Sequence, residues 1–353
     1  MIKKDFIIVG QGLAGTLLSY QLLKRKKSVM VINQSIPDTS SKVAAGIYNP
    51  ITGKRMVKTW KADLLFSYLE PFYHGLQSEL RASFLFPKQI YRPFISIEEQ
   101  NETMGKTASG DLNDFISWIS INSKYGNLIH DELGGFAIKS SGFVDLTKLI
   151  HYYQKYLVSR KSYLEDKFYE EDLIVFDNYL QYKNIVADRL VYCDGIESRN
   201  GRYFNWLPYN LVKGEIILIK ANIRFDSILS RGIFILPIGE GYYKVGSTYN
   251  WSDLNKDPTE NARNELLEKL KNLVKFPYEV VDQFAGIRPA TKDRRPFIGI
   301  HPKVKTIAIF NGLGTKGVSL APYFSGEFAD YLVLQKELDK DVNINRYNSL
   351  YYN

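Results

Sequence analysis

Cysteine and histidine, from which disulfides and most zinc sites are built, are scarce in this sequence. Cys193 is the one cysteine, and the four histidines lie along the chain without the spacing of metal ligands (His74, His130, His151 and His301). One cysteine cannot form an intramolecular disulfide or a cysteine-based zinc cluster. We therefore expect no metal ion in the chemistry of this protein.

Long hydrophobic runs are also lacking. No apolar stretch has the roughly 20 residues that a membrane-spanning helix needs. The apolar residues 6–9 follow a basic start, as in a signal peptide, but they stop at Gly10-Gln11-Gly12 and no cleavage site follows. These absences predict a cytoplasmic protein with no membrane partner.

Neither sign of charge dominates. The 46 basic and 38 acidic residues leave a net charge of +8, which is spread along the chain and only weakly favours nucleic acid, anionic substrates or a membrane surface as partners. The composition, 45% hydrophobic and 24% charged, is that of a folded globular protein. A length of 353 residues predicts two domains or one large α/β domain with an added lobe.

The strongest local pattern in the sequence lies in residues 6–34. A short apolar run typical of a buried strand leads into a glycine-rich turn, then into apolar residues at helical spacing, and then into a second apolar run at 29–32. This order of elements predicts a β-α-β unit. In dinucleotide-binding units, such a turn holds a pyrophosphate, so the pattern predicts a bound dinucleotide.

The residues of the turn have separate expected tasks. Gly10 allows the tight turn, Gly12 lets the backbone approach the pyrophosphate, and Gly15 lets the helix pack close to the strand. The beginning of the helix, at Leu13 and Ala14, would face the phosphates with unpaired N–H groups and the positive end of the helix dipole.

An acidic residue is missing at the end of the second strand. Dinucleotide-binding units usually place a carboxylate there to accept hydrogen bonds from the adenosine ribose, but this strand ends in Asn33 and Gln34. The Asn33 amide oxygen can still accept such a bond, more weakly because it carries no charge. The alternative is that Asn33 is an ordinary turn residue.

The glycine-rich turn and several later segments together resemble a known family. The segments follow in the same order as in the D-amino-acid oxidase and glycine oxidase superfamily of FAD-dependent oxidoreductases: 142–146, 189–198, 213–216, 236–237 with 245–248, 286–293 and 312–318. Two loops, 45–50 and 313–317, are most similar to the flavin domain of the bifunctional bacterial enzyme that modifies the tRNA wobble uridine. The sequence contains no counterpart of the methyltransferase half of that enzyme.

The resemblance implies an α/β fold in which a Rossmann-type FAD-binding domain is interleaved with an α+β substrate domain built on a mixed sheet. The expected limits are residues 1–55, 140–205 and 285–353 for the FAD-binding domain, and 56–139 and 206–284 for the substrate domain.

The resemblance also implies which residues contact FAD. The expected set is Gly10, Gly12, Leu13, Ala14, Gly15, Asn33, Gln34, Ser40, Ser41, Ala45, Gly46, Ile47, Cys193, Asp194, Gly195, Gly312, Gly314, Thr315, Lys316 and Gly317. Because the one cysteine lies inside one of these motifs, we expect FAD to bind without a covalent cysteinyl link.

Three positions are candidates for catalysis. Arg288 matches the family arginine whose planar fork of donors pairs with the substrate carboxylate, although an ion pair with an acidic side chain such as Asp293 is the alternative. Lys244 resembles the lysine that lies near flavin N5 in sarcosine-type oxidases and helps dioxygen accept electrons, although a solvated lysine is equally consistent. Thr315 stands where glycine oxidases have a second arginine, and Lys316 either compensates for that arginine or faces solvent.

A basic stretch at 52–55, continued by Lys58 and Lys61, is where we would expect a phosphate on the substrate to bind. A solvated helix start is the alternative.

The sequence leaves three functions open. The first is an FAD-dependent oxidoreductase that oxidises the C–N bond of an amino acid or secondary amine by hydride transfer to flavin N5. The second is an FAD-dependent tRNA wobble-uridine modification enzyme, which the loops and the positive charge favour. The third is a non-catalytic flavin-fold protein that binds a nucleotide or a partner. The amine, the electron acceptor and the oligomeric state are not evident from the sequence.

Overall fold

The β-α-β unit at the beginning of the chain forms the centre of the first of two large sheets. The computed structural model describes residues 1–53, 56–110 and 112–352. In it β1 (Ile2–Val9), α1 (Leu13–Lys24) and β2 (Val29–Asn33) follow one another as the sequence predicts. The strands β1 and β2 pair in parallel, so that their carboxyl ends meet at one edge of the sheet.

In the described part of the chain the first sheet has eight strands. Its order is β11-β2-β1-β14-β13-β12, with β21 and β20 attached through β14. The first half of β14 pairs with β13 and its second half with β21, while its other edge pairs with β1. The bounds are β11 (Tyr163–Glu165), β12 (Leu173–Val175), β13 (Leu180–Tyr182), β14 (Ile185–Tyr192), β20 (Phe297–Ile300) and β21 (Ile307–Asn311).

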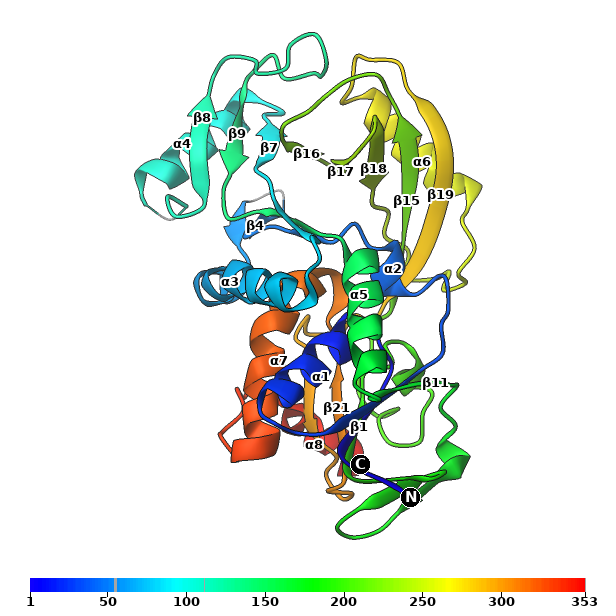
Figure 1. Ribbon diagram of the computed structural model, residues 1–353. Helices are drawn as coiled ribbons and strands as arrows, with labels where there is room; N and C mark the ends of the chain where they lie inside the picture. The colour runs from blue at the N-terminus through cyan, green and yellow to red at the C-terminus, as the bar shows by residue number, and fades with distance from the viewer. Residues whose placement is uncertain (54–55, 111, 353) are drawn as a thin grey trace.

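Both faces of this sheet are covered. Phe6 and Ile8 of β1 belong to a buried apolar cluster with α1, α5 (Leu146–Ser159) and α7 (Gly317–Leu334), whereas Ile7 belongs to a second cluster on the opposite face. Figure 1 shows α1 and α7 in front of β1 and β21. Burial on both faces explains why β1 is a continuous apolar run rather than an alternating one.

The second sheet also has eight strands within the described residues, in the order β19-β15-β18-β17-β16-β7-β9-β8. Neighbouring strands are antiparallel except β16 and β7. The helix α6 (Glu260–Lys271) covers one face with Leu266 and Leu270. The bounds are β7 (Ile90–Pro93), β8 (Ile116–Ser120), β9 (Gly135–Ile138), β15 (Val212–Lys220), β16 (Ile228–Arg231), β17 (Ile233–Gly239), β18 (Tyr242–Gly246) and β19 (Glu279–Arg288).

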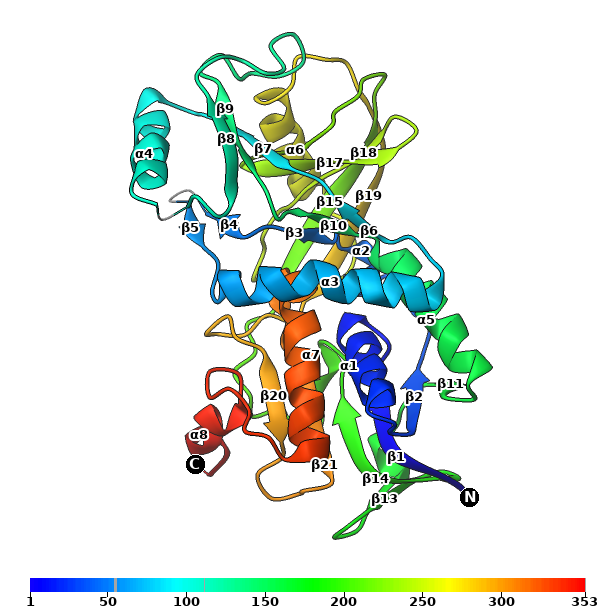
Figure 2. The same cartoon turned by 60° about the vertical axis from the view of Figure 1, so that its left-hand side comes forward.

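The remaining helices and strands lie outside the two large sheets. Figure 2 shows α3 (Ala62–Leu80) lying crosswise between them, above α1 and α7. The remaining elements are α2 (Ser40–Val43), β3 (Ile47–Tyr48), β4 (Ile51–Thr52), β5 (Val57–Lys58), β6 (Leu85–Pro87), α4 (Ile97–Ala108), β10 (Gly142–Val144) and α8 (Asn348–Tyr352), with the short 3-10 helices η1 (Glu170–Asp172), η2 (Glu197–Arg199), η3 (Gly314–Lys316) and η4 (Ile344–Tyr347).

The fold confirms the predicted class, a Rossmann-type α/β unit combined with a mixed sheet. The domain limits stay a prediction. One strand, β19, runs across the predicted limit between residues 284 and 285, and every residue of it except Val281 pairs with β15 of the second sheet.

Candidate cofactor and substrate site

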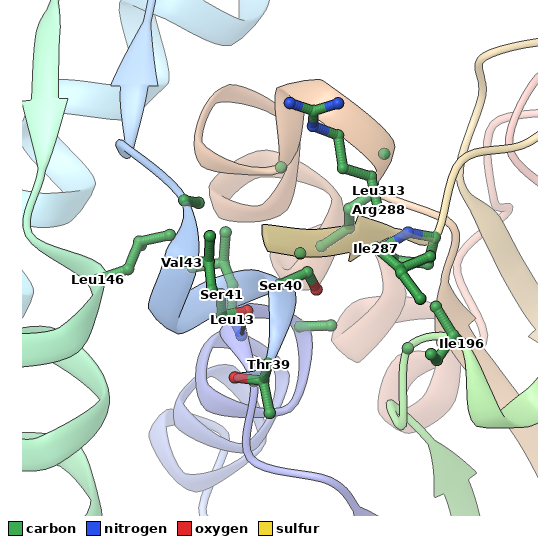
Figure 3. A pocket seen from close by; sticks show the side chains of 18 of the residues that line it. Leu13, Thr39, Ser40, Ser41, Val43, Leu146, Ile196, Ile287, Arg288 and Leu313 are labelled. Carbon is green, nitrogen blue, oxygen red and sulfur yellow. Dashed lines mark hydrogen bonds between the residues drawn. The ribbon is translucent and has the colours of Figure 1, made fainter. Parts of the chain in front are cut away.

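A cavity of about 870 Å³ runs from the carboxyl ends of β1, β2 and β14 to the inner face of the second sheet. Its lining includes Gly10 and Asn33 at the carboxyl ends of β1 and β2, and Gly214 and Arg288 of β15 and β19. In Figure 3, Leu13 lies at the beginning of α1, and the Arg288 guanidinium points away from it. The cavity therefore joins the predicted dinucleotide-binding edge to a second surface.

Most residues predicted to contact FAD line this cavity. They are Gly10, Gly12, Leu13, Ala14, Asn33, Gln34, Ser40, Ser41, Ala45, Gly46, Ile47, Cys193, Asp194, Gly195, Gly314, Thr315 and Gly317, and the predicted anchor Arg288 lines it too. The lining set does not include Gly15, Gly312, Lys244 and Lys316. The structure thus brings the set together, and the individual contacts with the cofactor stay a prediction.

The glycine-rich turn has no room for side chains at two of its positions. Gly10 has a φ of +93°, and a Cβ there would lie 2.8 Å from the Cys193 carbonyl oxygen. A Cβ on Gly15 would lie 1.9 Å from the Gly10 carbonyl oxygen, so α1 packs directly on the turn. Gly15 therefore acts through packing, which explains why it does not line the cavity.

The beginning of α1 forms the cavity wall next to this turn. Gly12 caps the helix without a side-chain acceptor, and the first turn contains no acidic residue. The Leu13 N–H donates to the Ser41 hydroxyl at 3.1 Å, which places α2 beside the helix end. An open helix N-terminus carries partial positive charge and suits a phosphate group.

Asn33 holds the glycine-rich turn in place. Its Oδ1 accepts a hydrogen bond from the Gln11 N–H at 2.9 Å, and its Nδ2 donates to the Tyr163 hydroxyl at 3.2 Å. The carbonyl oxygen of an amide has two lone pairs, so one is left for the predicted bond from a ribose hydroxyl. Asn33 thus has a task inside the protein that its position in the sequence did not predict.

Asp194 places a carboxyl group at the end of β14, beside the turn. The Ser198 hydroxyl and the Asn311 Nδ2, the latter at 3.2 Å, donate to it. Burial raises the pKa of Asp194 to about 7, and Glu197 and Glu170 act in the same direction. Because Asp194 lines the cavity, its charge state near neutral pH affects whatever binds there.

Sequence reasoning missed the segment that follows β11. Asp166, Lys167, Phe168 and Glu170 line the cavity. The strand β11 pairs in parallel with β2, so the chain emerges from both strands at the same edge. With three residues, β11 gives too short an apolar pattern to be recognised.

The loop before α7 forms a further wall. Thr315 and the adjacent glycines line the cavity, whereas Lys316 is half-buried and its Nζ donates to the Thr52 hydroxyl at 3.2 Å. Burial, together with the charges of Arg294 and Arg295, lowers the pKa of Lys316 to about 8. Lys316 is therefore neither a lining residue nor a fully solvated one.

Arg288 is held at the end of β19 by neighbouring loop residues. Its Nη2 donates to the Ser247 hydroxyl at 2.8 Å, and its Nη1 donates to the Thr248 carbonyl oxygen at 3.4 Å. The Tyr249 ring lies 4.8 Å from its Cζ. Burial lowers the pKa of Arg288, but a guanidinium stays charged at neutral pH.

The charge of Arg288 has no acidic partner among residues 1–53, 56–110 and 112–352. Asp293, the alternative partner, forms its ion pair with Arg346 at 2.9 Å instead, so that alternative is wrong. A largely buried cation that lines a cavity needs an anion to compensate its lost hydration. A carboxylate fits because it can accept two parallel bonds from the guanidinium.

Gly214 provides the space for this guanidinium. A Cβ on Gly214 would lie 2.0 Å from the Arg288 Nη2. The sequence indicates residues 213–216 only as a family motif and predicts no task for Gly214, Ser247 or Tyr249. A glycine inside a β-strand was the available signal, because it often marks the close approach of another group.

Lys244 lies on the cavity-facing side of the second sheet, beyond the lining residues. Gly246, two residues along β18 on the same face, pairs with Ile216 and Phe234, which line the cavity. Burial lowers the pKa of Lys244. Its predicted task next to the flavin stays a prediction.

The predicted phosphate-binding stretch is described only in part, because Lys54 and Arg55 lie outside the described residues. The two lysines that follow do not line the cavity, and each pairs with an aspartate, Lys58 with Asp63 and Lys61 with Asp339.

The residues present fit FAD. The glycine cradle and the open end of α1 suit its pyrophosphate, and the apolar side chains of Ile196, Ile287 and Leu313 (Figure 3) suit the flat ring systems. The Cys193 side chain is buried, with its Cβ beside Gly15, and burial raises the pKa of its thiol well above the ordinary value. A protonated, buried thiol is a poor nucleophile, in agreement with a flavin that is not attached to it.

The part of the chain described contains no group of three or more His, Cys, Asp or Glu side chains that could hold a metal ion. His301 is a structural residue, because its Nδ1 accepts bonds from the N–H groups of Lys303 and Val304, and burial lowers its pKa to about 4. Within the described ranges, no helix has the length and apolar character that a bilayer crossing requires.

Comparison with known proteins identifies the family to which this cavity belongs. The sequence model of the family DAO, described as FAD dependent oxidoreductase, matches residues 5–331. The chain is 24% identical to glycine oxidase of Bacillus subtilis over 361 residues, covering 96% of this chain and 95% of that protein. It is also 24% identical to the tRNA 5-methylaminomethyl-2-thiouridine biosynthesis bifunctional protein MnmC of Leptospira interrogans, covering 98% of this chain but 59% of that protein.

Solved structures share the fold. Iminodiacetate oxidase from Chelativorans sp. BNC1 superposes with a TM-score of 0.77 at 20% identity, covering 97% of this chain and 98% of the other. At this level of identity the likeness concerns the arrangement of the elements, and it does not transfer a substrate.

Proposed function

The chain belongs to the DAO family of FAD-dependent oxidoreductases, and we propose that it oxidises the C–N bond of an amino acid or secondary amine whose carboxylate pairs with Arg288. Membership makes it an FAD-binding enzyme of the amine or amino-acid oxidase type. The finer proposal depends on one observation: the Arg288 guanidinium, which has no acidic partner in the described part of the chain, lines the same cavity as the glycine-rich turn.

The chemistry that FAD supplies when bound is acceptance of a hydride at flavin N5 from the carbon next to the amine nitrogen. Loss of the hydride turns the uncharged amine into an iminium ion, which water hydrolyses to a carbonyl compound and ammonia or a smaller amine. The protein binds and orients the substrate. The fork of Arg288 holds the carboxylate at two points, and Ile216 and Phe234 form the apolar wall beside it.

No side chain has to remove a proton if the amine binds in its uncharged form. Lys244 then remains the proposed group that stabilises negative charge developing on dioxygen, because it is half-buried on the face that looks towards the cavity. Thr315, which lines the cavity at the position of the second arginine of glycine oxidases, is uncharged, so Arg288 is the one proposed anchor of the carboxylate.

A screen of flavin reduction tests the proposal. The FAD-loaded protein is mixed without oxygen with amino acids and N-alkylated amino acids, and the flavin absorbance is followed. We expect an amine that carries a carboxylate to bleach the flavin much faster than the same amine without it. Bleaching by amines regardless of a carboxylate would contradict the role of Arg288, and no bleaching by any amine would contradict the proposed reaction.

A modified uridine in tRNA is the second candidate substrate, and one feature favours it. Tyr249 lines the cavity beside Arg288, is 53% exposed, and stacks with Trp251, which is 58% exposed. Exposed aromatic pairs are surfaces on which unpaired bases stack. MnmC, one of the relatives, carries a tRNA modification in its name, although the chain spans 59% of its length.

This second candidate has its own test. The tRNA candidate would be supported if undermodified tRNA reduced the flavin and free amines did not. This reduction should be lost in Trp251→Ala and should weaken steeply as the salt concentration rises. Equal flavin reduction by free amines in the Trp251→Ala variant and the unchanged protein supports the first candidate.

A further inference from the structure

A fully buried lysine lies directly behind the carboxylate-binding end of the cavity. Lys213 of β15 has no exposed surface, and the proposed reaction does not use it. Its Nζ donates to the Asp253 Oδ2 at 2.9 Å, to the Asn255 Oδ1 at 2.7 Å and to the Asp257 carbonyl oxygen at 2.6 Å. An ammonium group has three donors, so all of them are used.

The acceptors all belong to one loop, residues 250–257. The backbone of Lys213 also pairs with Asn250 in both directions, at 2.8 and 2.9 Å. Glu215, the next residue on the same face of β15, accepts bonds from the N–H and the hydroxyl of Thr259, both at 2.8 Å. Two residues of one strand therefore hold both ends of the loop.

The charges in this cluster explain why it holds the loop firmly. Asp253 lies 2.9 Å and Glu215 lies 3.6 Å from the Lys213 Nζ. A buried ammonium group is stable only with acidic and hydrogen-bonding partners, and here the loop supplies most of them. If the loop moved away, the lysine would lose its three hydrogen-bond acceptors and would keep the Glu215 carboxylate at 3.6 Å.

The same loop and the residues before it form the wall around Arg288. Ser247 and Thr248 accept the hydrogen bonds of its guanidinium, Tyr249 lies against it, and Lys256 lines the cavity. Side chains alternate along a strand, so Lys213 and Glu215 hold the loop from one face of β15 while Gly214, on the other face, makes room for Arg288.

We propose that Lys213 is a positioning residue for substrate binding: its ammonium group fixes residues 250–257 and through them keeps Tyr249, Lys256 and the partners of Arg288 in place. The inference rests on one part of the proposed function, namely that Arg288 binds a carboxylate. A guanidinium binds a carboxylate at two points more tightly when its orientation is fixed beforehand, because less conformational entropy is lost on binding. Releasing the loop therefore weakens carboxylate binding without touching Arg288 itself.

The test compares variants of the FAD-loaded protein, with acetate as the carboxylate probe. Lys213→Met removes the ammonium group, and Lys213→Arg keeps the charge. Asp253→Ala removes one of the three acceptors of the ammonium group. Because the Asp253 side chain is a third exposed, we expect this variant to fold even if Lys213→Met is unstable. Leu270→Ala is the matched control, because Leu270 lies on α6 and is buried in the apolar cluster of the same sheet.

Two readouts are measured: acetate binding, from the change in flavin absorbance, and the rate of tryptic cleavage after Lys256. We expect Lys213→Met and Asp253→Ala to speed this cleavage and to weaken acetate binding about tenfold, the loss expected when a charge-assisted pair is no longer held in position. We expect Lys213→Arg to retain most of the binding, and Leu270→Ala to lower the unfolding temperature while acetate binding stays unchanged.

With an amine that reduces the flavin, KM is expected to rise in the two loop-releasing variants while the limiting rate of flavin reduction stays within about twofold. Unchanged acetate binding despite faster cleavage would overturn the inference, because Lys213 would then be only structural. Equal weakening in Leu270→Ala would overturn it as well. If acetate binds as expected but no amine reduces the flavin, the proposed reaction fails and the positioning role stands.

Discussion

The Arg288 guanidinium lies directly over Gly214, and a methyl group on Gly214 would come within 2.0 Å of the Arg288 Nη2. Gly214→Ala is therefore expected to displace the guanidinium while leaving its charge in the protein. The expected result is roughly a ten- to hundred-fold loss of kcat/KM for carboxylate-bearing amines, the equivalent of one good charge-assisted contact. Stopped-flow measurement of flavin reduction checks it.

Gly75→Ala is the control for this substitution. Gly75 lies in α3, and a Cβ added there would have no neighbouring atom within 4 Å, so the extra methyl group meets open space. FAD content is expected to be normal in both variants. Full activity of Gly214→Ala would contradict this prediction, because the displaced guanidinium would then still bind the carboxylate from another position.

A second prediction concerns the bond between Asn33 and the Gln11 N–H. Asn33→Leu leaves this N–H without its acceptor beside the glycine-rich turn, at a cost of about 1–3 kcal/mol. The FAD dissociation constant is expected to rise, whereas Asn33→Asp, which still offers an acceptor, is expected to retain or improve binding. Equilibrium titration of the FAD-free protein measures both constants. Equal affinity of the Leu variant and the unchanged protein would show that the turn does not need this bond.

The raised pKa of Asp194 predicts how stability depends on pH. With a pKa of about 7 in the folded protein and 3.8 as the ordinary value, the folded state binds more protons between these two pH values. Its contribution to stability is therefore present in full below about pH 4 and is lost as the pH rises towards and through 7. The size is on the order of a few kcal/mol.

Urea unfolding at pH 5.5 and pH 8, with saturating FAD, measures this dependence. Asp194→Asn, which is uncharged at both pH values, is expected to reduce the loss of stability between them. A loss of the same size in the variant would assign the pH dependence to other groups.

The sequence predicted the part of the site that is local in the chain. Gly10, Gly12 and Gly15 follow one strand and begin one helix, so their spacing alone reveals the turn that they form. Arg288 was recognised through the family motif, but its surroundings were not. Gly214, Ser247 and Tyr249 reach it because β15 pairs with both β18 and β19, and such long-range pairing leaves no periodic pattern in the sequence.

The same reasoning explains the missed residues after β11 and the cluster around Lys213. The short strand β11 becomes visible only by its pairing with β2. A lysine next to a glycine in a strand predicts an exposed side chain, and its burial follows only from a loop some 40 residues later that supplies the acceptors.

The central claim is tested most directly by comparing the unchanged protein with Arg288→Lys. Anaerobic flavin reduction is measured in both proteins with two matched amines, N-methylglycine and its counterpart without the carboxylate. Lysine keeps the positive charge but loses the two-point geometry. We expect the variant to have a normal FAD content. For N-methylglycine we expect a ten- to hundred-fold lower kcat/KM, mainly through a higher KM, because a charge-assisted contact contributes about 1.5 to 3 kcal/mol. We expect little change in kcat/KM for the counterpart. Equal effects on both amines, or none on either, would contradict the assignment of Arg288 as the anchor of the substrate carboxylate.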